Sequence, residues 1–269
     1  MNKIKATLTI LAIFIWAGLL APVQMIILLF FKQHRYCIPR IFHKGLCRLL
    51  RVKVVTSGTI EKSRPTLFVL NHISWLDIPV IGSALHGSFV AKREVESYPL
   101  IGPISKLQQT IFIERSRPAI KGHKGEMQEH LEKGDNLFLF PEGTSSNGII
   151  IQSFKSAYFG LAERKIGDRH LPVQPVTLAY SRMNGIPLTR GTMGIVAWVG
   201  DEELLSHVWE YLKRGKITAE LRFHPPVTID DYDSRKTMAS DCQMTIAKSL
   251  SRALTGRDEP ERPESRTVR

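Results

Sequence analysis

The sequence predicts an α/β domain with a mixed, largely parallel central sheet flanked by helices, preceded by an N-terminal membrane-associated helical segment. Three observations predict this class. Apolar runs rich in β-branched and aromatic residues recur along the chain. Stretches of helical character separate several of these runs. One long uncharged apolar segment stands near the N-terminus. We expect three regions: a membrane anchor with a basic helix over residues 1–51, a folded domain over 52–256 and a charged tail over 257–269.

The composition predicts an anionic partner and a reducing environment. The 269 residues include 37 Lys and Arg against 25 Asp and Glu, a formal net charge of +12. Such an excess favours either nucleic acid or an acidic membrane surface. The three cysteines Cys37, Cys47 and Cys242 are scattered, with no disulfide framework and no metal-ligand spacing. We therefore expect no metal site.

The anchor is predicted from Leu8 to Phe31, a run of 24 residues without a charge. As a helix it would extend about 36 Å, against a hydrocarbon core of about 30 Å. A secretory signal is the alternative, because Lys3 and Lys5 give a basic start. The apolar run is longer than an ordinary signal, however, and no small-residue cleavage site follows it. Pro22 should kink the helix, which leaves a single span and two half-helices in one leaflet both open.

A basic amphipathic helix is predicted after the anchor. Apolar residues recur there at roughly helical spacing among six basic ones, namely Lys32, Arg35, Arg40, Lys44, Arg48 and Arg51. This pattern favours binding to anionic membrane lipids, and an ordinary surface helix packed on the domain is the alternative. The basic excess on this side places the catalytic domain on the cytoplasmic face of the inner membrane if the anchor spans. Nucleic acid is then not expected as a partner.

The domain itself alternates between strand and helix patterns. Strands are expected at 66–70, 88–91, 110–113, 136–140, 173–180, 192–199 and 217–223, and helices at 118–133, 154–166, 202–213 and 234–254. From Arg257 onward the chain is rich in charge and proline and has no apolar pattern to bury, so a disordered tail is expected.

The first chemical motif is a histidine and a carboxylate at the end of the 66–70 strand. Pro79 fits only within the first turn of a helix, so the next helix should begin near Asp77. His72 then lies in the preceding loop, where Asp77 can fix its tautomer and stabilise its protonated ring. The alternative is helix capping, by Asp77 alone or together with Ser74. No Gly-x-Ser-x-Gly elbow is present, so the pair suggests activation of a substrate hydroxyl rather than a serine nucleophile.

Three further segments bear comparison with binding motifs: two predicted strands that end in polar residues, and one that is only apolar. The 136–140 strand leads into Glu142, Gly143 and Thr144, where backbone N–H groups suit an oxyanion or phosphate and the carboxylate suits a hydroxyl or cation. The alternative is an ordinary tight turn. The 110–113 strand ends at Arg115, which suits a charged head group, although a surface ion pair is the more common use of such an arginine. Val173 to Val176 indicates only a strand.

Together the four segments resemble the glycerolipid acyltransferase family, which includes 1-acyl-glycerol-3-phosphate acyltransferases. The matching residues are His72 and Asp77, Phe112 to Arg115, Phe140 to Thr144 and Val173 to Val176, within about residues 60–225. The resemblance implies transfer of a fatty acyl group from acyl-carrier protein or coenzyme A to a lysolipid hydroxyl, with no bound cofactor. It also implies that His72 is the general base and Asp77 its orienting partner, with direct attack on the thioester and no acyl-enzyme.

Two departures from the family pattern bear on the acceptor. Ser145 stands where an arginine often follows Glu-Gly-Thr, and Gln109 replaces the usual glycine before the Phe-Ile-x-Arg strand. A bidentate phosphate anchor is thereby lost, and Lys92 and Lys155 are the remaining candidates to bind the acceptor. The chain looks more like the branch that acylates lyso-ornithine lipids, with agreement at 152–156, 197–201 and 222–226. Lysophosphatidic acid stays open as an alternative acceptor.

Two other classes compete with this hypothesis. One is a membrane-binding scaffold of the same fold without turnover, which the intact polar motifs around His72 and Glu142 disfavour. The other is a lipid hydrolase, which the missing nucleophile disfavours.

Overall fold

The computed structural model describes residues 3–63, 65–113, 124–200 and 202–256. The helices are α1 (Lys3–Phe30), α2 (Cys37–Leu49), α3 (Asp77–Ala84), α4 (Ile101–Leu107), α6 (Lys124–Glu132), α7 (Leu204–Leu212) and α8 (Arg235–Thr255), with short 3-10 helices at Lys32–His34, Arg93–Ser97, Ser156–Leu161, Met193–Ile195 and Ile229–Asp231. The strands are β1 (Val52–Gly58), β2 (Leu67–Leu70), β3 (Ser88–Lys92), β4 (Ile111–Ile113), β5 (Leu137–Leu139), β6 (Lys165–Ile166), β7 (Arg169–His170), β8 (Val173–Met183), β9 (Ile186–Pro187) and β10 (Ile217–Phe223).

The central sheet is mixed and largely parallel, as expected from the sequence. Its strand order is β1-β10-β8-β2-β5-β3-β4, with β9 paired to β8. All neighbouring strands from β8 to β4 are parallel, whereas β10 runs antiparallel to β8 and parallel to β1. The carboxyl ends of β2, β5 and β3 therefore lie at one edge of the sheet, which is where binding sites form in such folds.

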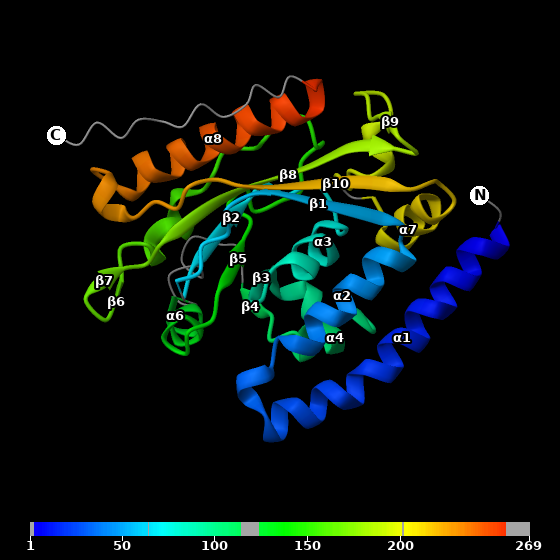
Figure 1. Cartoon of the computed structure of the whole chain (residues 1–269), viewed down its shortest axis with the longest axis horizontal. Helices are drawn as coiled ribbons and strands as arrows, with labels where there is room; N and C mark the ends of the chain where they lie inside the picture. The colour runs from blue at the N-terminus through cyan, green and yellow to red at the C-terminus, as the bar shows by residue number, and fades with distance from the viewer. Residues whose placement is uncertain (1–2, 64, 114–123, 201, 257–269) are drawn as a thin grey trace.

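Helices cover both faces of this sheet (Figure 1). Helix α8 lies across one face, and α2 and α3 lie under the other, with α1 outermost. Alternate residues of one strand supply the two cores, since successive side chains point to opposite faces. In β2, Phe68 and Leu70 pack with α2 and α3, and Leu67 and Val69 pack with α6 and α8. The sheet is thus buried on both sides, and its edges and loops are left for chemistry.

The predicted N-terminal helices are both present. Helix α1 is a continuous helix of 28 residues with Pro22 inside it, long and apolar enough to cross a membrane and little buried in the fold. Helix α2 packs on α3 and under α1, burying Pro39, His43 and Cys47. The apolar positions of α2 are therefore used at least in part against the domain, which agrees with the packed-helix alternative.

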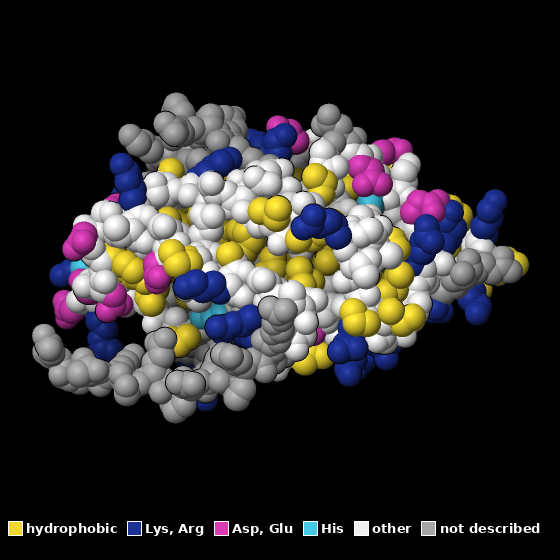
Figure 2. All heavy atoms as spheres, turned by 90° about the horizontal axis from the view of Figure 1, so that it is seen from above, with side chains coloured by type: hydrophobic (Ala, Val, Ile, Leu, Met, Phe, Trp, Pro, Cys, Tyr) yellow, Lys and Arg dark blue, Asp and Glu magenta, His cyan; other side chains and the backbone are white. Residues whose placement is uncertain are grey.

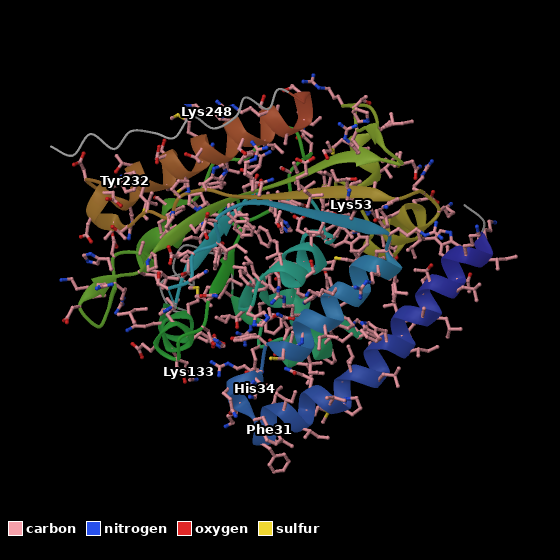
Figure 3. The ribbon with its side chains drawn as sticks, in the orientation of Figure 1. Phe31, His34, Lys53, Lys133, Tyr232 and Lys248 are labelled. Carbon is pink, nitrogen blue, oxygen red and sulfur yellow. The ribbon has the colours of Figure 1, made fainter. Side chains whose placement is uncertain are left out.

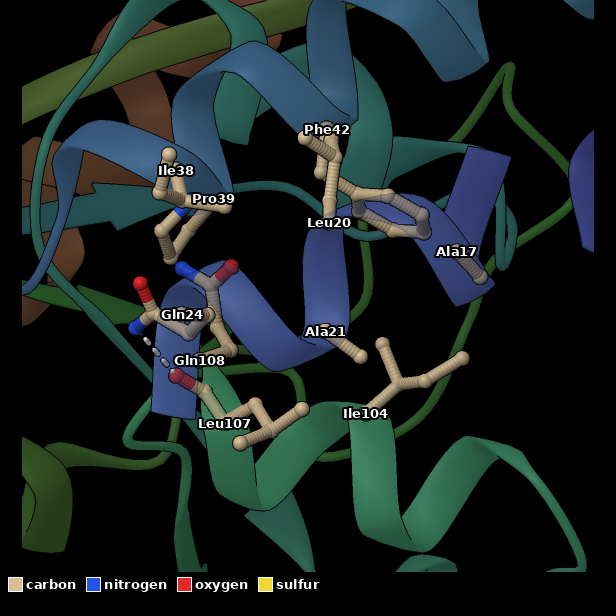
Figure 4. Close-up of a pocket in the computed structure, with 10 residues that line it drawn as sticks. All are labelled: Ala17, Leu20, Ala21, Gln24, Ile38, Pro39, Phe42, Ile104, Leu107 and Gln108. Carbon is tan, nitrogen blue, oxygen red and sulfur yellow. Dashed lines mark hydrogen bonds between the residues drawn. The ribbon is translucent and has the colours of Figure 1, made fainter. Parts of the chain in front are cut away.

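The far end of α1 is tied to the domain. Gln24 is 2% exposed, and its amide N–H₂ donates to the carbonyls of Arg35 and Leu107, both at 2.8 Å. Figure 4 shows the bond to Leu107 at the side of a small apolar pocket that α1, α2 and α4 enclose. The chain then turns back at Phe31 and His34, where the phenyl ring projects away from the fold (Figure 3).

Basic side chains are spread over the surface. Figure 2, which views the side that carries α8, shows Lys and Arg across this face and grouped at the end where α1 begins. This distribution fits the net charge of +12.

Two predicted elements are wrong. Residues 192–199 form a short 3-10 helix followed by irregular chain rather than a strand, because their backbone groups bond to loops and not to the sheet. Residues 154–166 contain the 3-10 helix Ser156–Leu161 and the first strand of the β6–β7 hairpin rather than an α-helix. Strand β1 was not expected. The predicted tail over 257–269 lies outside the described residues.

Candidate active site

The predicted histidine–carboxylate pair is formed. His72 follows β2, and Asp77 is the first residue of α3, as the position of Pro79 predicts. His72 Nδ1 lies 2.7 Å from Asp77 Oδ2; the carboxylate is fully buried, and 15% of the histidine side chain is exposed. The amino end of a helix favours a negative charge, so the place of Asp77 in the first turn suits a carboxylate.

Asp77 does not cap α3 in the way that the alternative requires. Its Oδ2 accepts the N–H of Ile73 at 2.7 Å and that of Ser74 at 3.0 Å, both of which precede the helix. Its Oδ1 accepts the hydroxyl of Tyr180 at 2.8 Å. The hydroxyl of Ser74 is buried and has no partner among the described residues, so it forms no capping box with Asp77. The carboxylate instead organises the loop that carries His72.

The ring of His72 is held with one nitrogen available. Because Nδ1 faces a carboxylate, it carries the proton and Nε2 keeps its lone pair. No protein hydrogen bond to Nε2 occurs among the residues that the structure describes. Phe140 stacks on the ring, with centroids 4.2 Å apart and planes inclined by 20°. Such a nitrogen, oriented but unpaired, can accept a proton from a substrate.

The backbone of His72 is fixed by the Glu142 turn. Its N–H donates to Glu142 Oε1 at 2.7 Å, and its carbonyl accepts the N–H and the hydroxyl of Ser146 at 2.8 and 3.0 Å. The other oxygen of Glu142 accepts the N–H of Gln152 at 2.6 Å. Glu142 is 2% exposed, so its carboxylate contacts backbone groups and not an open cleft. Glu142 thereby positions His72.

Burial raises the pKa of Glu142 to about 7, and the charge of Asp77 acts in the same direction. The two N–H donors and His72 oppose this rise, because they stabilise the ionised form.

A cationic side chain lies over the same turn. Gly143 has a φ of 74°, and a Cβ built at this residue would lie 2.5 Å from Lys155 Nζ. The backbone conformation therefore favours glycine there, and the close approach shows that Lys155 lies directly over the turn. Thr144 is exposed next to it, and Lys155 is also exposed. Among the described residues, no acid pairs with this ammonium. The turn and the lysine together can bind an anion.

Of the two remaining predicted binding residues, the one that the structure describes, Lys92, lies elsewhere. Lys92 ends β3, and β5 lies between β3 and the strand that leads to His72. Its ammonium is 2.8 Å from Glu94, and both side chains are well exposed, so the structure gives it a surface ion pair. Arg115 lies outside the described residues.

Sequence reasoning missed three contacts. Asn71 hydrogen-bonds through both side-chain atoms to the backbone of Leu178, each at 2.9 Å. Tyr180 reaches Asp77 from the same strand. The hydroxyl of Ser145 donates to the carbonyl of Trp198. The one available signal was the polar Tyr180 within an apolar strand, because a buried phenol needs a partner.

Comparisons with a family model and with individual known proteins indicate the same family. The Acyltransferase family model matches residues 51–179. The lyso-ornithine lipid O-acyltransferase of Brucella abortus is 37% identical over 246 residues, which cover 90% of this chain and 92% of that one. The 1-acyl-sn-glycerol-3-phosphate acyltransferase of Neisseria gonorrhoeae is 31% identical over 164 residues, 61% of this chain and 60% of that one.

A solved structure has the same fold. The crystal structure of the 1-acyl-sn-glycerophosphate acyltransferase PlsC from Thermotoga maritima matches with a TM-score of 0.68 and 21% sequence identity, over 97% of this chain and 100% of that one.

Proposed function

This chain belongs to the acyltransferase family and is an O-acyltransferase, and from that premise we propose that it transfers a fatty acyl group to the hydroxyl of lyso-ornithine lipid. The observation that carries the proposal is the His72–Asp77 pair, in which Nε2 bonds to no group in the described part of the chain. The acceptor is inferred from the relatives: the proteins that match along most of this chain are named lyso-ornithine lipid O-acyltransferases.

The chemistry follows from the geometry of His72. Nε2 takes the proton of the acceptor hydroxyl as its oxygen attacks the thioester carbonyl. The carbon–sulfur bond then breaks, and the thiolate recovers the proton from the imidazolium. Asp77 stabilises the charged ring throughout. No acyl-enzyme is required, because the attacking oxygen belongs to the substrate. Backbone N–H groups at the Gly143 turn are the candidates for stabilising the oxyanion.

The anion site at the Gly143 turn supports an acceptor with a carboxylate. Lys155 supplies one point charge there, whereas phosphate recognition commonly uses the bidentate fork of an arginine. Position 145 holds a serine whose hydroxyl is bonded to Trp198, so it offers no such fork. An ornithine-based acceptor presents a carboxylate in place of a phosphate. Lysophosphatidic acid is the second candidate, on the similarity to the Neisseria gonorrhoeae enzyme.

The donor and the location complete the proposal. We expect acyl-carrier protein or coenzyme A to deliver the acyl group as a thioester, with no resident cofactor or metal. The apolar face of α1 and the nearby basic residues support binding to anionic lipids on the cytoplasmic face of the inner membrane. Direct binding of substrate by Glu142, Thr144 and Lys92 stays a prediction.

The test is acyl transfer by purified enzyme in mixed micelles. Wild type is assayed with acyl-acyl-carrier protein or acyl-coenzyme A and with each lysolipid in turn. We expect ornithine lipid as the main product and a loss of about 100- to 10,000-fold in kcat for His72→Ala. His170→Ala is the matched control, since His170 forms a similar 2.7 Å pair with Asp230 on the surface. Its kcat should stay at the wild-type value.

Two outcomes would contradict the proposal. Turnover by His72→Ala within a few-fold of wild type would remove the histidine from the mechanism. Transfer to neither lysolipid by the folded wild-type protein would favour the membrane-binding scaffold instead.

A further inference from the structure

A buried tyrosine reaches the candidate active site from the opposite side of the core. Tyr180 lies near the carboxyl end of β8 and is fully buried. Its hydroxyl donates to Asp77 Oδ1 at 2.8 Å. Burial and the charge of Asp77 raise the pKa of this phenol well above its usual 10, so it stays protonated and acts as a donor. A phenol in an apolar core is costly without such a partner.

The two oxygens of Asp77 have different partners. Oδ2 accepts His72 Nδ1 and the N–H groups of Ile73 and Ser74, all of which belong to the catalytic loop. Oδ1 accepts the hydroxyl of Tyr180, which belongs to the sheet. A carboxylate can turn about its last bond, and a donor on each oxygen fixes its plane. The tyrosine therefore helps to fix the plane in which the carboxylate meets the imidazole.

Hydrogen bonds fix the strand that carries Tyr180 relative to the loop that carries His72. Parallel pairing of β2 with β8 ends at Leu70 and Val176. The side chain of Asn71 then continues it by bonding to both the N–H and the carbonyl of Leu178. Tyr180 is two residues further on and so points to the same face of the sheet. On its other side it pairs with Ala219 of β10. The part of β8 that carries Tyr180 is thus hydrogen-bonded on both sides, to Asn71 and to β10.

We propose that Tyr180 is a positioning residue for the acyl transfer, which orients the Asp77 carboxylate and through it the base His72. This inference rests on the proposed function, because it assumes that His72 takes the proton. Outer partners of this kind hold the groups that they contact in tautomer and orientation. Without the hydroxyl, Oδ1 loses its donor, and only the three bonds to Oδ2 hold the plane of the carboxylate.

The test is Tyr180→Phe, with Tyr36→Phe as the matched control. Tyr36 is 9% exposed, and its hydroxyl lies 2.8 Å from that of Ser88 at the start of β3, so the same atom is removed from a buried bond away from Asp77. We expect kcat of Tyr180→Phe to fall on the order of tenfold, with the KM values of both substrates within twofold of wild type. Tyr36→Phe should keep the wild-type kcat.

The pH profile gives a readout that a merely structural role would not move. The hydroxyl of Tyr180 stabilises the negative charge of Asp77 by donating to it. Because that donor is lost in Tyr180→Phe, more of the charge is available to His72, and the imidazolium is stabilised more strongly. The base then loses its proton only at higher pH, and the acid limb of kcat shifts upward. The other titratable groups that face this pair are Glu142 from its turn, Cys47 from α2 and Tyr211 from α7. Burial raises the pKa of Cys47 to about 11 and raises that of Tyr211, so both stay neutral across the assay range.

A double-mutant cycle with Asp77→Asn shows whether Tyr180 acts through the carboxylate. The effect of Tyr180→Phe should disappear in the Asp77→Asn background. If Tyr180→Phe lowers kcat by the same factor there, or leaves kcat and the acid limb unchanged in the wild-type background, the proposal is wrong.

A second variant covers a failure of Tyr180→Phe to fold. Fluorotyrosine placed at residue 180 is a stronger donor, so the acid limb should move to lower pH. An unmoved limb would again overturn the proposal. Activity in His72→Ala contradicts the proposed function, whereas these results, read on an active wild type, contradict only the role of Tyr180.

Discussion

At the scale of single residues, Glu142 is held between two opposing effects. Its removal from water favours the neutral acid, and its two backbone N–H donors, at 2.6 and 2.7 Å, favour the carboxylate. Removal from water is the larger effect and brings the pKa to about 7. The residue that fixes the backbone of His72 therefore changes its charge within the physiological pH range.

A pH-dependent stability follows for Glu142. Its pKa is about 7 in the fold and 4.5 in the ordinary reference state. Between these values the folded protein binds more protons at Glu142 than the unfolded chain does. The contribution of Glu142 to the free energy of unfolding is therefore fully present below about pH 4.5 and is lost as the pH rises through 7. The cost is about 3 kcal/mol when complete. In Glu142→Gln this dependence is absent, so thermal unfolding in detergent should show wild type losing stability relative to the variant between pH 5 and 7.5.

Glu129→Gln is the control for this measurement, because Glu129 is exposed and its pKa is lowered by the bond to Lys133. Its stability difference from wild type should not fall with rising pH. A constant difference between wild type and Glu142→Gln over the same range would contradict the expected ionisation.

At the scale of elements, the apolar pattern of the sequence predicts the strands of the sheet but does not show whether an apolar run pairs with a strand at all. The β2, β3, β4, β5, β8 and β10 strands follow from apolar runs, and the sheet buries both faces of β2, β4, β5 and most of β8. The run at 192–199 has a similar apolar composition, but it pairs with no strand of the described sheet. Composition cannot distinguish these two fates, since the partner of a backbone group is decided by tertiary structure.

The candidate site divides in the same way. The contact between His72 and Asp77 was predicted, because both residues belong to one short loop whose geometry Pro79 restricts. Tyr180 lies 103 residues from Asp77 along the chain, so a single sequence offers no local pattern that joins them. Lys92 was a candidate because it could replace a lost arginine, and the order of the strands places β5 between its strand and the one that leads to His72.

Residues 193–200, here termed the strap, illustrate an element held by the site itself. The N–H of Trp198 donates to the carbonyl of Ile73 at 3.0 Å, and the carbonyl of Trp198 accepts the hydroxyl of Ser145. His207 Nδ1 accepts the indole N–H of Trp75 at 2.9 Å, which leaves Nε2 to donate to the carbonyl of Ala197 at 3.2 Å. The strap is thus bonded to both loops that surround His72.

Removal of one of these bonds should loosen the strap. Ser145→Ala removes the hydroxyl that holds Trp198, which costs about 1 kcal/mol. We expect faster hydrogen exchange in a peptide covering 193–200 and an acceptor KM that rises about two- to tenfold, with the donor KM unchanged. Ser153→Ala, at an exposed serine near the same turn, is the control. Wild-type exchange rates in Ser145→Ala would show that Ser145 does not hold the strap.

At the scale of the whole molecule, α1 is attached to the catalytic domain near both of its ends. Ala6 is fully buried against the main core, and Gln24 is bonded to Leu107 beside α4. These residues are 18 positions apart, or about 27 Å along a helix. Close by, the N-terminal segment adds an ion pair of Arg35 with Asp135 and a 2.8 Å bond between Tyr36 and Ser88. The outer side of α1 is apolar over most of its length.

This attachment predicts that α1 lies in one leaflet rather than across the membrane. If it crossed the bilayer while packed on the domain, α4 and α7 would be carried to hydrocarbon depth. Exposed charges on these helices, such as Lys106 of α4 and Glu210 of α7, would then be buried in lipid at a cost of several kcal/mol. With α1 parallel to the surface, the apolar side enters the lipid and the charged surface stays in water.

The sidedness of single cysteines tests this orientation. In a Cys37→Ser background, where the other two native cysteines are buried, Lys5→Cys marks the start of α1 and Lys133→Cys marks the domain. Lys133 lies on the surface near α6 (Figure 3). In sealed proteoliposomes, an impermeant maleimide should label both cysteines to the same fraction before detergent is added. If α1 crosses the bilayer, the two lie on opposite sides, so the fraction labelled at one equals the fraction protected at the other.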